Sequence, residues 1–252
     1  MKTFKVTLAY DGTGYYGWQE QPGLPTIEGL LKKRLIKLFK MDVPFTGASR
    51  TDVGVHALGQ VARCQLALDI SAERFKVIVN RILPPEIMIR SVEEVQEEFH
   101  PRVGVQEKTY YYHFFVQQPV PFLSSYGLVV KHLDLTLLEE CLQVFKGKHD
   151  FRSFCTGDQG RTTERTINSL ELHFYKRYGV YQIRIKGPSF LRHMIRRIVG
   201  ACFEVSSSRK SKEEALACLS QTLEGKDPCH TLFVAPAKGL LLHSIRYHER
   251  GI

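Results

Sequence analysis

An aspartate near an arginine lies in the most unusual stretch of the sequence. Residues 47–57 read GASRTDVGVHA, so that small and polar residues surround Asp52, and Arg50 precedes it by two positions. A guanidinium close to a carboxyl group favours the charged carboxylate. An ionised aspartate can act as a nucleophile or a general base, and Asp52 is therefore the first candidate for catalysis.

The same segment has a simpler interpretation as a surface turn. Aspartate and glycine are common turn residues, so a stretch of this kind most often forms only a loop. The sequence lacks the usual motifs of kinases, metalloproteases and hydrolases: it has no G-x-x-x-x-G-K-[ST], no H-E-x-x-H and no G-x-S-x-G. The six cysteines lack the C-x-x-C spacing of a zinc site, and we expect no bound metal.

A glycine motif near the start of the chain suggests a competing function, the binding of a dinucleotide cofactor. Gly12, Gly14 and Gly17 satisfy G-x-G-x-x-G after a predicted strand, which is the pattern of a dinucleotide-binding turn. Such a turn must run directly into a helix, but aromatic residues and Pro22 follow here. We interpret the segment as a glycine-rich turn covered by aromatic residues and expect no cofactor. A nicotinamide or flavin enzyme would instead show cofactor absorbance when purified.

The elements that must position these residues follow from hydrophobic periodicity. Alternation over 4–10 predicts a strand, and a single apolar face over 27–39 predicts a helix capped by Thr26. A second helix is expected after Ser71 and before Pro84, because proline ends a helix.

The second half of the chain mixes strands and helices without regular alternation. Strands are predicted at 110–116, at 170–174 and 181–185 as a hairpin, and at 240–247. Helices are predicted after capping boxes at Thr136 with Glu139 and at Ser211 with Glu214, and over residues 190–205. This irregular order indicates an α+β fold.

Composition and charge limit the class of protein. A hydrophobic share of 43% and a charged share of 24% are typical of a soluble globular protein. The net charge of +9 and the pI of about 9.2 are compatible with a polyanionic partner such as a nucleic acid, and equally with a well-solvated basic protein. The N-terminal segment lacks the apolar core of a signal peptide, and no apolar run approaches the roughly 18 residues of a membrane span. We therefore expect a cytoplasmic protein that does not enter a membrane.

Motifs spread over nearly the whole chain resemble those of the tRNA pseudouridine synthase A (TruA) family. In order, they are Tyr10-Asp11-Gly12 with Tyr16-Gly17-Trp18-Gln19, Arg50-Thr51-Asp52 with Gly54-Val55-His56, Lys108-x-Tyr110-x-Tyr112, His149-Asp150-Phe151 with Phe190-Leu191-Arg192-His193-Met194-Ile195-Arg196, and Gly239-Leu240-x-Leu242. Two positions depart from the family pattern. Ser49 stands where the family often has glycine, and Val53 stands where it usually has alanine.

The resemblance implies a role for each matched residue. Asp52 attacks the target uridine, and the base detaches, rotates and rejoins through carbon without any cofactor. Arg50 fills the space that the flipped base leaves, Tyr110 stacks on the base, and Arg196 pairs with Asp52. The substrate-binding residues that it implies are Tyr110, Arg50, Arg192 and Phe190.

Structural alternatives stay open for these assignments. Tyr110 lies among other aromatic residues and could be part of the core, and Arg196 could belong to a solvated basic helix face. His56 is left outside the catalytic set. Basic residues expected along the RNA path are Lys32, Lys33, Arg34, Arg192, Arg197 and Lys210.

The expected architecture has two similar α+β lobes with mostly antiparallel sheets, the pseudouridine synthase fold, and an active-site cleft between the lobes. We place the boundary between Glu97 and Glu107, which gives an N-terminal lobe of residues 1–104 and a C-terminal lobe of residues 105–252. The resemblance implies the anticodon stem-loop of tRNA as substrate and a homodimer. The competing class is a non-catalytic RNA-binding protein that acts as an RNA chaperone.

Overall fold

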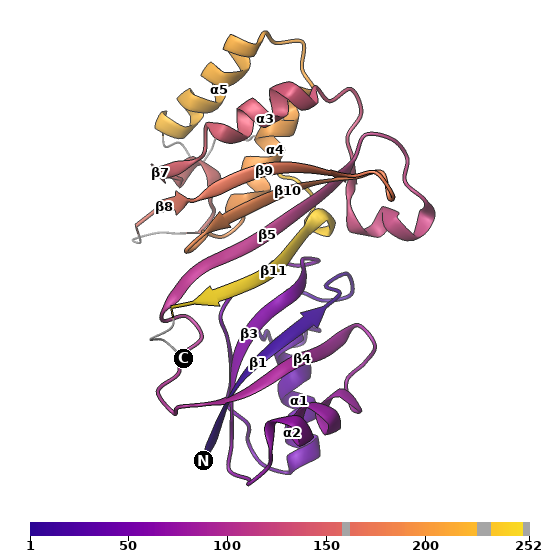
Figure 1. Cartoon of the computed structure of the whole chain (residues 1–252), viewed down its shortest axis with the longest axis vertical. Helices are drawn as coiled ribbons and strands as arrows, with labels where there is room; N and C mark the ends of the chain where they lie inside the picture. The colour runs from indigo at the N-terminus through magenta and orange to yellow at the C-terminus, as the bar shows by residue number, and fades with distance from the viewer. Residues whose placement is uncertain (158–161, 226–232, 249–252) are drawn as a thin grey trace. The chain divides into compact units, whose positions relative to one another are not determined.

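The computed structural model describes residues 1–157, 162–225 and 233–248. The chain divides into two compact units, the first comprising Met1–Lys108 with Leu241–Ile252 and the second Thr109–Leu240. Each unit combines strands with helices (Figure 1), which confirms the predicted α+β class.

The sheet of the first unit is mostly antiparallel. Its strands are β1 (Lys2–Tyr10), β2 (Phe45–Gly47), β3 (His56–Leu66), β4 (Ile87–Val95) and β11 (Leu240–Tyr247). They follow the order β4-β1-β3-β11, and β2 pairs with β3. Strand β11 is parallel to β3, with Leu241 opposite His56. The predicted C-terminal lobe of residues 105–252 includes this last strand, whereas its pairing with β3 joins it to the first unit.

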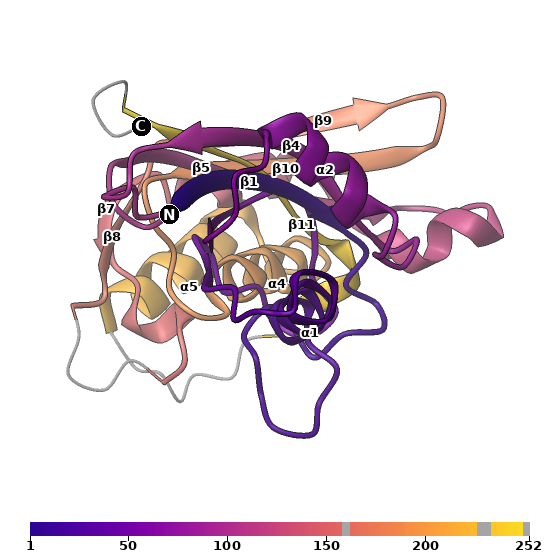
Figure 2. The same cartoon turned by 90° about the horizontal axis from the view of Figure 1, so that it is seen from below.

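Two helices pack on the face of this sheet that carries Phe4. They are α1 (Ile27–Phe39), which Thr26 caps, and α2 (Ala72–Asn80), which Ser71 caps. The ring of Phe75 on α2 stacks on Phe4 of β1 at 5.1 Å and on Phe39 of α1 at 5.9 Å. Figure 2 shows α1 on the lower side of β1. Both helices agree with the sequence prediction, and these aromatic contacts join them to each other and to β1.

The second unit is built on three neighbouring strands in the order β5-β10-β9. Its strands are β5 (Val105–Phe115), which begins in the first unit, β6 (Leu128–Val129), β7 (Gly147–Asp150), β8 (Glu164–Ile167), β9 (Ser169–Tyr175) and β10 (Val180–Gly187). Strands β9 and β10 form the predicted antiparallel hairpin, and β7 pairs with β8 in a separate sheet.

The described residues of the second unit also form three helices and three short 3-10 segments. The helices are α3 (Leu135–Gln143), α4 (Met194–Ser206) and α5 (Lys212–Gly225), and the 3-10 segments are η1 (Pro121–Tyr126), η2 (Arg152–Phe154) and η3 (Ala237–Gly239). Phe203 of α4 packs edge-on against Tyr112 and Phe114 of β5. The core of this unit therefore lies between α4 and the strands.

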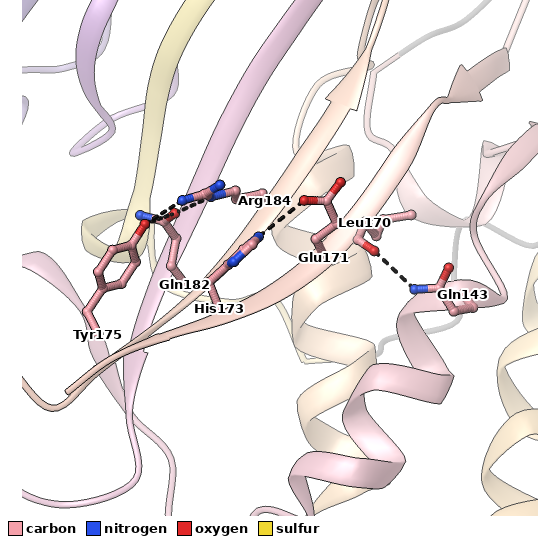
Figure 3. A network of polar contacts seen from close by, with 7 residues as sticks. All are labelled: Gln143, Leu170, Glu171, His173, Tyr175, Gln182 and Arg184. Atoms are coloured by element: carbon pink, nitrogen blue, oxygen red, sulfur yellow. Dashed lines mark hydrogen bonds and ion pairs between the residues drawn. The ribbon is translucent and has the colours of Figure 1, made fainter.

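A polar network runs along the β9–β10 hairpin (Figure 3). Arg184 donates hydrogen bonds to the side chains of Gln182 and Tyr175, and His173 contacts Glu171 at 3.2 Å. This contact with His173 is the main cause that lowers the pKa of the Glu171 carboxyl. Gln143 at the end of α3 donates to the Leu170 carbonyl of β9 at 3.0 Å and so ties a helix to the same hairpin.

Two helix starts differ from the sequence prediction. Helix α3 is capped by the side chain of Asp134, which accepts from Leu137 N at 2.9 Å, so the proposed capping box at Thr136 is wrong. The capping box of Ser211 with Glu214 is confirmed in both directions. Helix α4 begins at Met194 rather than near residue 190, because His193 adopts a left-handed conformation with φ of 62°.

Candidate active site

Asp52 begins a tight turn between β2 and β3. Its carbonyl accepts a hydrogen bond from Val55 N at 3.1 Å, and Gly54 has a φ of 76°, which favours glycine. Thr51 is buried, Asp52 is half-buried and Arg50 is exposed. The turn interpretation is therefore correct for the local backbone. Whether Asp52 can also take part in catalysis depends on the residues that surround the turn.

Thr51, the residue before Asp52, is held by the last residue of β1 and by the segment that follows β1. The Tyr10 hydroxyl lies 2.7 Å from the Thr51 hydroxyl, and Trp18 N donates to the Thr51 carbonyl at 3.1 Å. Trp18 itself is buried and stacks on Phe45 of β2. The position of Asp52 is thus fixed through its neighbour and not through the turn alone.

The glycine motif supports this loop. A Cβ atom on Gly12 would lie 2.1 Å from the Val55 carbonyl oxygen, and one on Gly17 would lie 2.6 Å from the Thr51 carbonyl oxygen. Gly17 also has a φ of 80°. Gly14, by contrast, faces open space. The motif lets two backbone segments approach closely, in agreement with the glycine-turn interpretation.

The residues that lead into the loop are held by the side chain of Gln60. Ser49 N donates to Gln60 Oε1 at 3.2 Å, and Gln60 Nε2 donates to the Ser49 carbonyl at 2.6 Å. Ala48 N donates to the Val61 carbonyl at 2.8 Å. The Gln60 side chain therefore binds the Ser49 backbone as a neighbouring strand would. In this way it extends the pairing of β3 into the loop.

Two basic side chains bind the carbonyl groups of the same segment. Arg102 Nε donates to Gly47 O at 3.0 Å, and Lys108 Nζ donates to Ala48 O at 3.0 Å and to Ser49 Oγ at 2.8 Å. Burial, with a smaller contribution from Arg102, lowers the pKa of Lys108 to about 8. Sequence patterns indicate no role for Gln60 or Arg102 and identify Lys108 only as a motif residue, because these contacts join residues that are far apart in the chain.

His56, at the start of β3, contacts the segment that carries the glycine motif of Gly12, Gly14 and Gly17, which we call the glycine segment. Its Nδ1 atom lies 3.0 Å from Asp11 Oδ1 and 3.2 Å from Gly12 N. The Asp11 carboxylate also accepts from the backbone and hydroxyl of Thr13. These contacts support a positional role and agree with leaving His56 outside the catalytic set.

In the second unit, Tyr110 and Phe190 lie together. Their rings meet edge to face, with centroids 5.4 Å apart and an interplanar angle of 82°. Tyr110 is 8% exposed and Phe190 is half-buried. The Tyr110 side chain shares its strand face with Tyr112 and Phe114, so it is the end of an aromatic row.

The matched arginines flank the start of α4. Arg192 is exposed, and its carbonyl accepts from Thr156 N at 3.3 Å. Arg196 is half-buried on the first turn of the helix, and its Nε donates to Ala235 O at 2.8 Å. Thr156 also binds His193 Nδ1 at 2.7 Å, which holds the residue before the helix in its left-handed conformation.

The candidate residues thus form two sets. Arg50 and Asp52 share one loop of the first unit, whereas Tyr110, Phe190, Arg192 and Arg196 belong to the second. The meeting of Asp52 with Tyr110 and Arg196 stays a prediction.

The basic residues expected along an RNA path differ in exposure. Lys33, Arg34, Arg192 and Lys210 are exposed. Lys32 pairs with Glu20 at 3.0 Å, and Arg197 is half-buried. The exposed four are the better candidates for contacts with phosphate groups.

Two further features concern only the described residues. They contain no group of three His, Cys, Asp or Glu side chains that could hold a metal ion. Among these same residues, every helix is too short or too polar to cross a membrane.

Comparison with known proteins gives a consistent result. A family model described as tRNA pseudouridine synthase matches residues 7–102 and 142–248. Proteins named tRNA pseudouridine synthase A from Pseudothermotoga lettingae and Solibacter usitatus are 36% and 38% identical to this chain, and each alignment covers 98% of this chain and 100% of the relative. The Aquifex aeolicus protein of the same name is 36% identical over 97% of this chain and 99% of its own length.

Solved structures give a more distant similarity. One described as "Crystal Structure of a Cbf5-Nop10-Gar1 Complex" matches 78% of this chain with a TM-score of 0.33 and 12% identity, and the match spans 45% of that chain. At this level it carries no argument about substrate or assembly.

Proposed function

Because the chain belongs to the tRNA pseudouridine synthase family, we propose that it isomerises uridine to pseudouridine in tRNA with Asp52 as the catalytic carboxylate. The observation that carries the assignment of Asp52 is the support of its loop. Thr51 is held by the Tyr10 hydroxyl of β1 and by Trp18 N, and the Ser49 backbone is held by the Gln60 side chain of β3. A loop that served only as a connection would not need such support.

The chemistry requires no external reagent. The bond from N1 of the base to C1′ of the ribose breaks, a bond from C5 to C1′ forms, the C5 proton leaves and N1 gains a proton, so the product is an isomer. Asp52 is the nucleophile that engages the nucleoside while the base is detached. An arginine that pairs with this carboxylate keeps it ionised and oriented, and Arg196 is assigned this role.

The remaining assigned residues act on the extruded base. Taking a base out of its stack costs a few kcal/mol, which the protein must offset. An aromatic platform such as Tyr110, with Phe190 against its edge, returns roughly 1–3 kcal/mol per stacked base. The exposed guanidinium of Arg50 is able to fill the vacated space, and Arg192 is suited to a phosphate contact.

The proposal extends to the target region of the substrate and to the assembly of the protein. Relatives named tRNA pseudouridine synthase A support tRNA as the substrate, and we propose that the target uridines lie in its anticodon stem-loop. We further propose a homodimer that acts in the cytoplasm. Sedimentation velocity of the purified protein, in which a single species at the monomer mass would contradict the dimer, tests its assembly.

An Asp52→Asn variant separates the enzyme from a non-catalytic RNA-binding protein. We expect it to abolish pseudouridine formation in purified tRNA while its affinity for tRNA stays similar, because the change removes a charge without changing the size of the side chain. The control is Asp42→Asn, which alters an exposed aspartate of the same unit and should keep full activity. Equal activity of Asp52→Asn and the wild type would refute the assignment.

A further inference from the structure

The ammonium group of Lys108 ends inside the first unit, against the backbone that leads into Asp52. Its Nζ atom donates to Ala48 O at 3.0 Å and to Ser49 Oγ at 2.8 Å. Lysine is seldom buried without a partner, because an ammonium group loses much of its hydration there. The placement of this side chain therefore needs an explanation.

Stability alone does not provide that explanation. Burial disfavours the charged form of Lys108 and lowers its pKa to about 8, and the nearby Arg102 acts in the same direction. A neutral side chain of similar length would avoid this cost. A cation that is retained at such a cost is expected where it serves the function of the loop.

The two acceptors of Lys108 lie at an informative place. Ala48 and Ser49 come four and three residues before Asp52, and the Ser49 backbone is already held by Gln60. Lys108 also binds the Ser49 hydroxyl, and a glycine at position 49 could not make this contact. Both Gln60 and Lys108 therefore bind the segment that leads into Asp52.

We infer that Lys108 is a positioning residue for the catalytic aspartate and that the Ser49 hydroxyl is its partner in this chain. The inference rests on the proposed function. Lys108 acts through the backbone of the loop and need not touch the uridine. Its loss should therefore slow the chemical step more than it weakens the binding of tRNA.

The first test compares Lys108→Met with Lys108→Arg in single-turnover assays on purified tRNA. A displacement of about 1 Å can cost about 100-fold in rate, so we expect Lys108→Met to lose about 10- to 100-fold with little change in tRNA affinity. Lys108→Arg, which keeps a cationic donor, should recover part of the rate. The control is Arg246→Met, which removes a cation bound at 2.6 Å to the adjacent Glu107 without touching the loop.

The second test measures the coupling between the two side chains. Ser49→Gly should lower the rate in the wild-type background and have little further effect in the Lys108→Met background, because the bond is already absent there. Independent effects that multiply in the double variant would overturn the partnership of Ser49 with Lys108.

The outcomes distinguish the inference from the proposed function. If the wild type forms no pseudouridine in any tRNA, the proposed function fails. If the wild type is active and Lys108→Met is folded with an unchanged single-turnover rate, or if Lys108→Met loses tRNA affinity in proportion to its rate, the inference alone fails. Circular dichroism and thermal unfolding of each variant establish that it is folded.

Discussion

At the scale of single residues, the position of the Asp52 loop depends on the absence of a side chain at two glycines as well as on the hydrogen bonds of its neighbours. Gly12 and Gly17 allow the backbone of the glycine segment to approach the carbonyls of Val55 and Thr51. Any side chain at either position would push the loop away. Gly14 has no such neighbour, although it belongs to the same motif.

Replacing Gly12 by alanine should therefore reduce both stability and activity. The added Cβ would lie 2.1 Å from a backbone oxygen, which cannot rotate away. Overpacking of this kind costs about 1–3 kcal/mol, and the displaced loop should lower the rate of pseudouridine formation. Thermal unfolding and single-turnover assays measure the two effects.

Gly14→Ala is the matched control for Gly12→Ala. Nothing lies within 4 Å of the added Cβ, so stability should change by less than about 0.5 kcal/mol. Equal losses in the two variants would contradict the close-approach explanation, because they would mean that the motif acts through chain flexibility instead.

At the scale of elements, helix α4 is joined along its length to the segment 233–236. Ala235 N donates to the Arg196 carbonyl at 3.0 Å, and Phe233 N donates to the Glu204 carboxylate at 2.9 Å. A Cβ on Gly200, which lies between these two residues on the helix, would come within 1.7 Å of the Phe233 carbonyl oxygen. The segment and the helix that carries Arg196 therefore pack as one piece.

Gly200→Ala should separate the segment from the helix. Alanine favours helix formation by up to about 1 kcal/mol over glycine, but the steric conflict should exceed this gain and lower the melting temperature. Gly225→Ala at the end of α5 serves as the control, because no described residue lies within 4 Å of the added Cβ. A Gly200→Ala protein that is as stable as the wild type, measured by calorimetry, would argue against this packing.

At the scale of the whole molecule, positive charge is in excess, with a net charge of +9. Association with a polyanion releases counterions, so the affinity for tRNA should fall steeply as salt increases. The exposed Lys33, Arg34, Arg192 and Lys210 are the residues assigned to this effect.

Neutralising one of these residues at a time tests the assignment. Each glutamine variant should reduce the slope of log affinity against log salt by about 1 if it removes a phosphate contact. Lys148→Gln is the control, because this exposed lysine pairs with Glu164 at 3.3 Å and is not assigned to the RNA path. Fluorescence anisotropy with labelled tRNA gives the slopes, and slopes that are all equal to that of the wild type would refute the assignment.

The sequence by itself determined most elements and the identity of the candidate residues. Strand β1, helices α1 and α2 and the β9–β10 hairpin follow from apolar periodicity and caps, which depend on residues close together in the chain. The start of α4 was harder to predict, because the left-handed His193 is stabilised by Thr156, which is distant in sequence. Asp52, Arg50 and Tyr110 were found from motifs.

Only the tertiary structure decided what holds those residues. Lys108 and Ala48 are 60 positions apart, Tyr10 and Thr51 are 41 apart, and β11 returns from the end of the chain to pair with β3. Such contacts depend on which distant surfaces fit together, and no local pattern encodes them. The sequence therefore identified the aspartate, and the fold revealed the lysine, glutamine and glycines that fix its position.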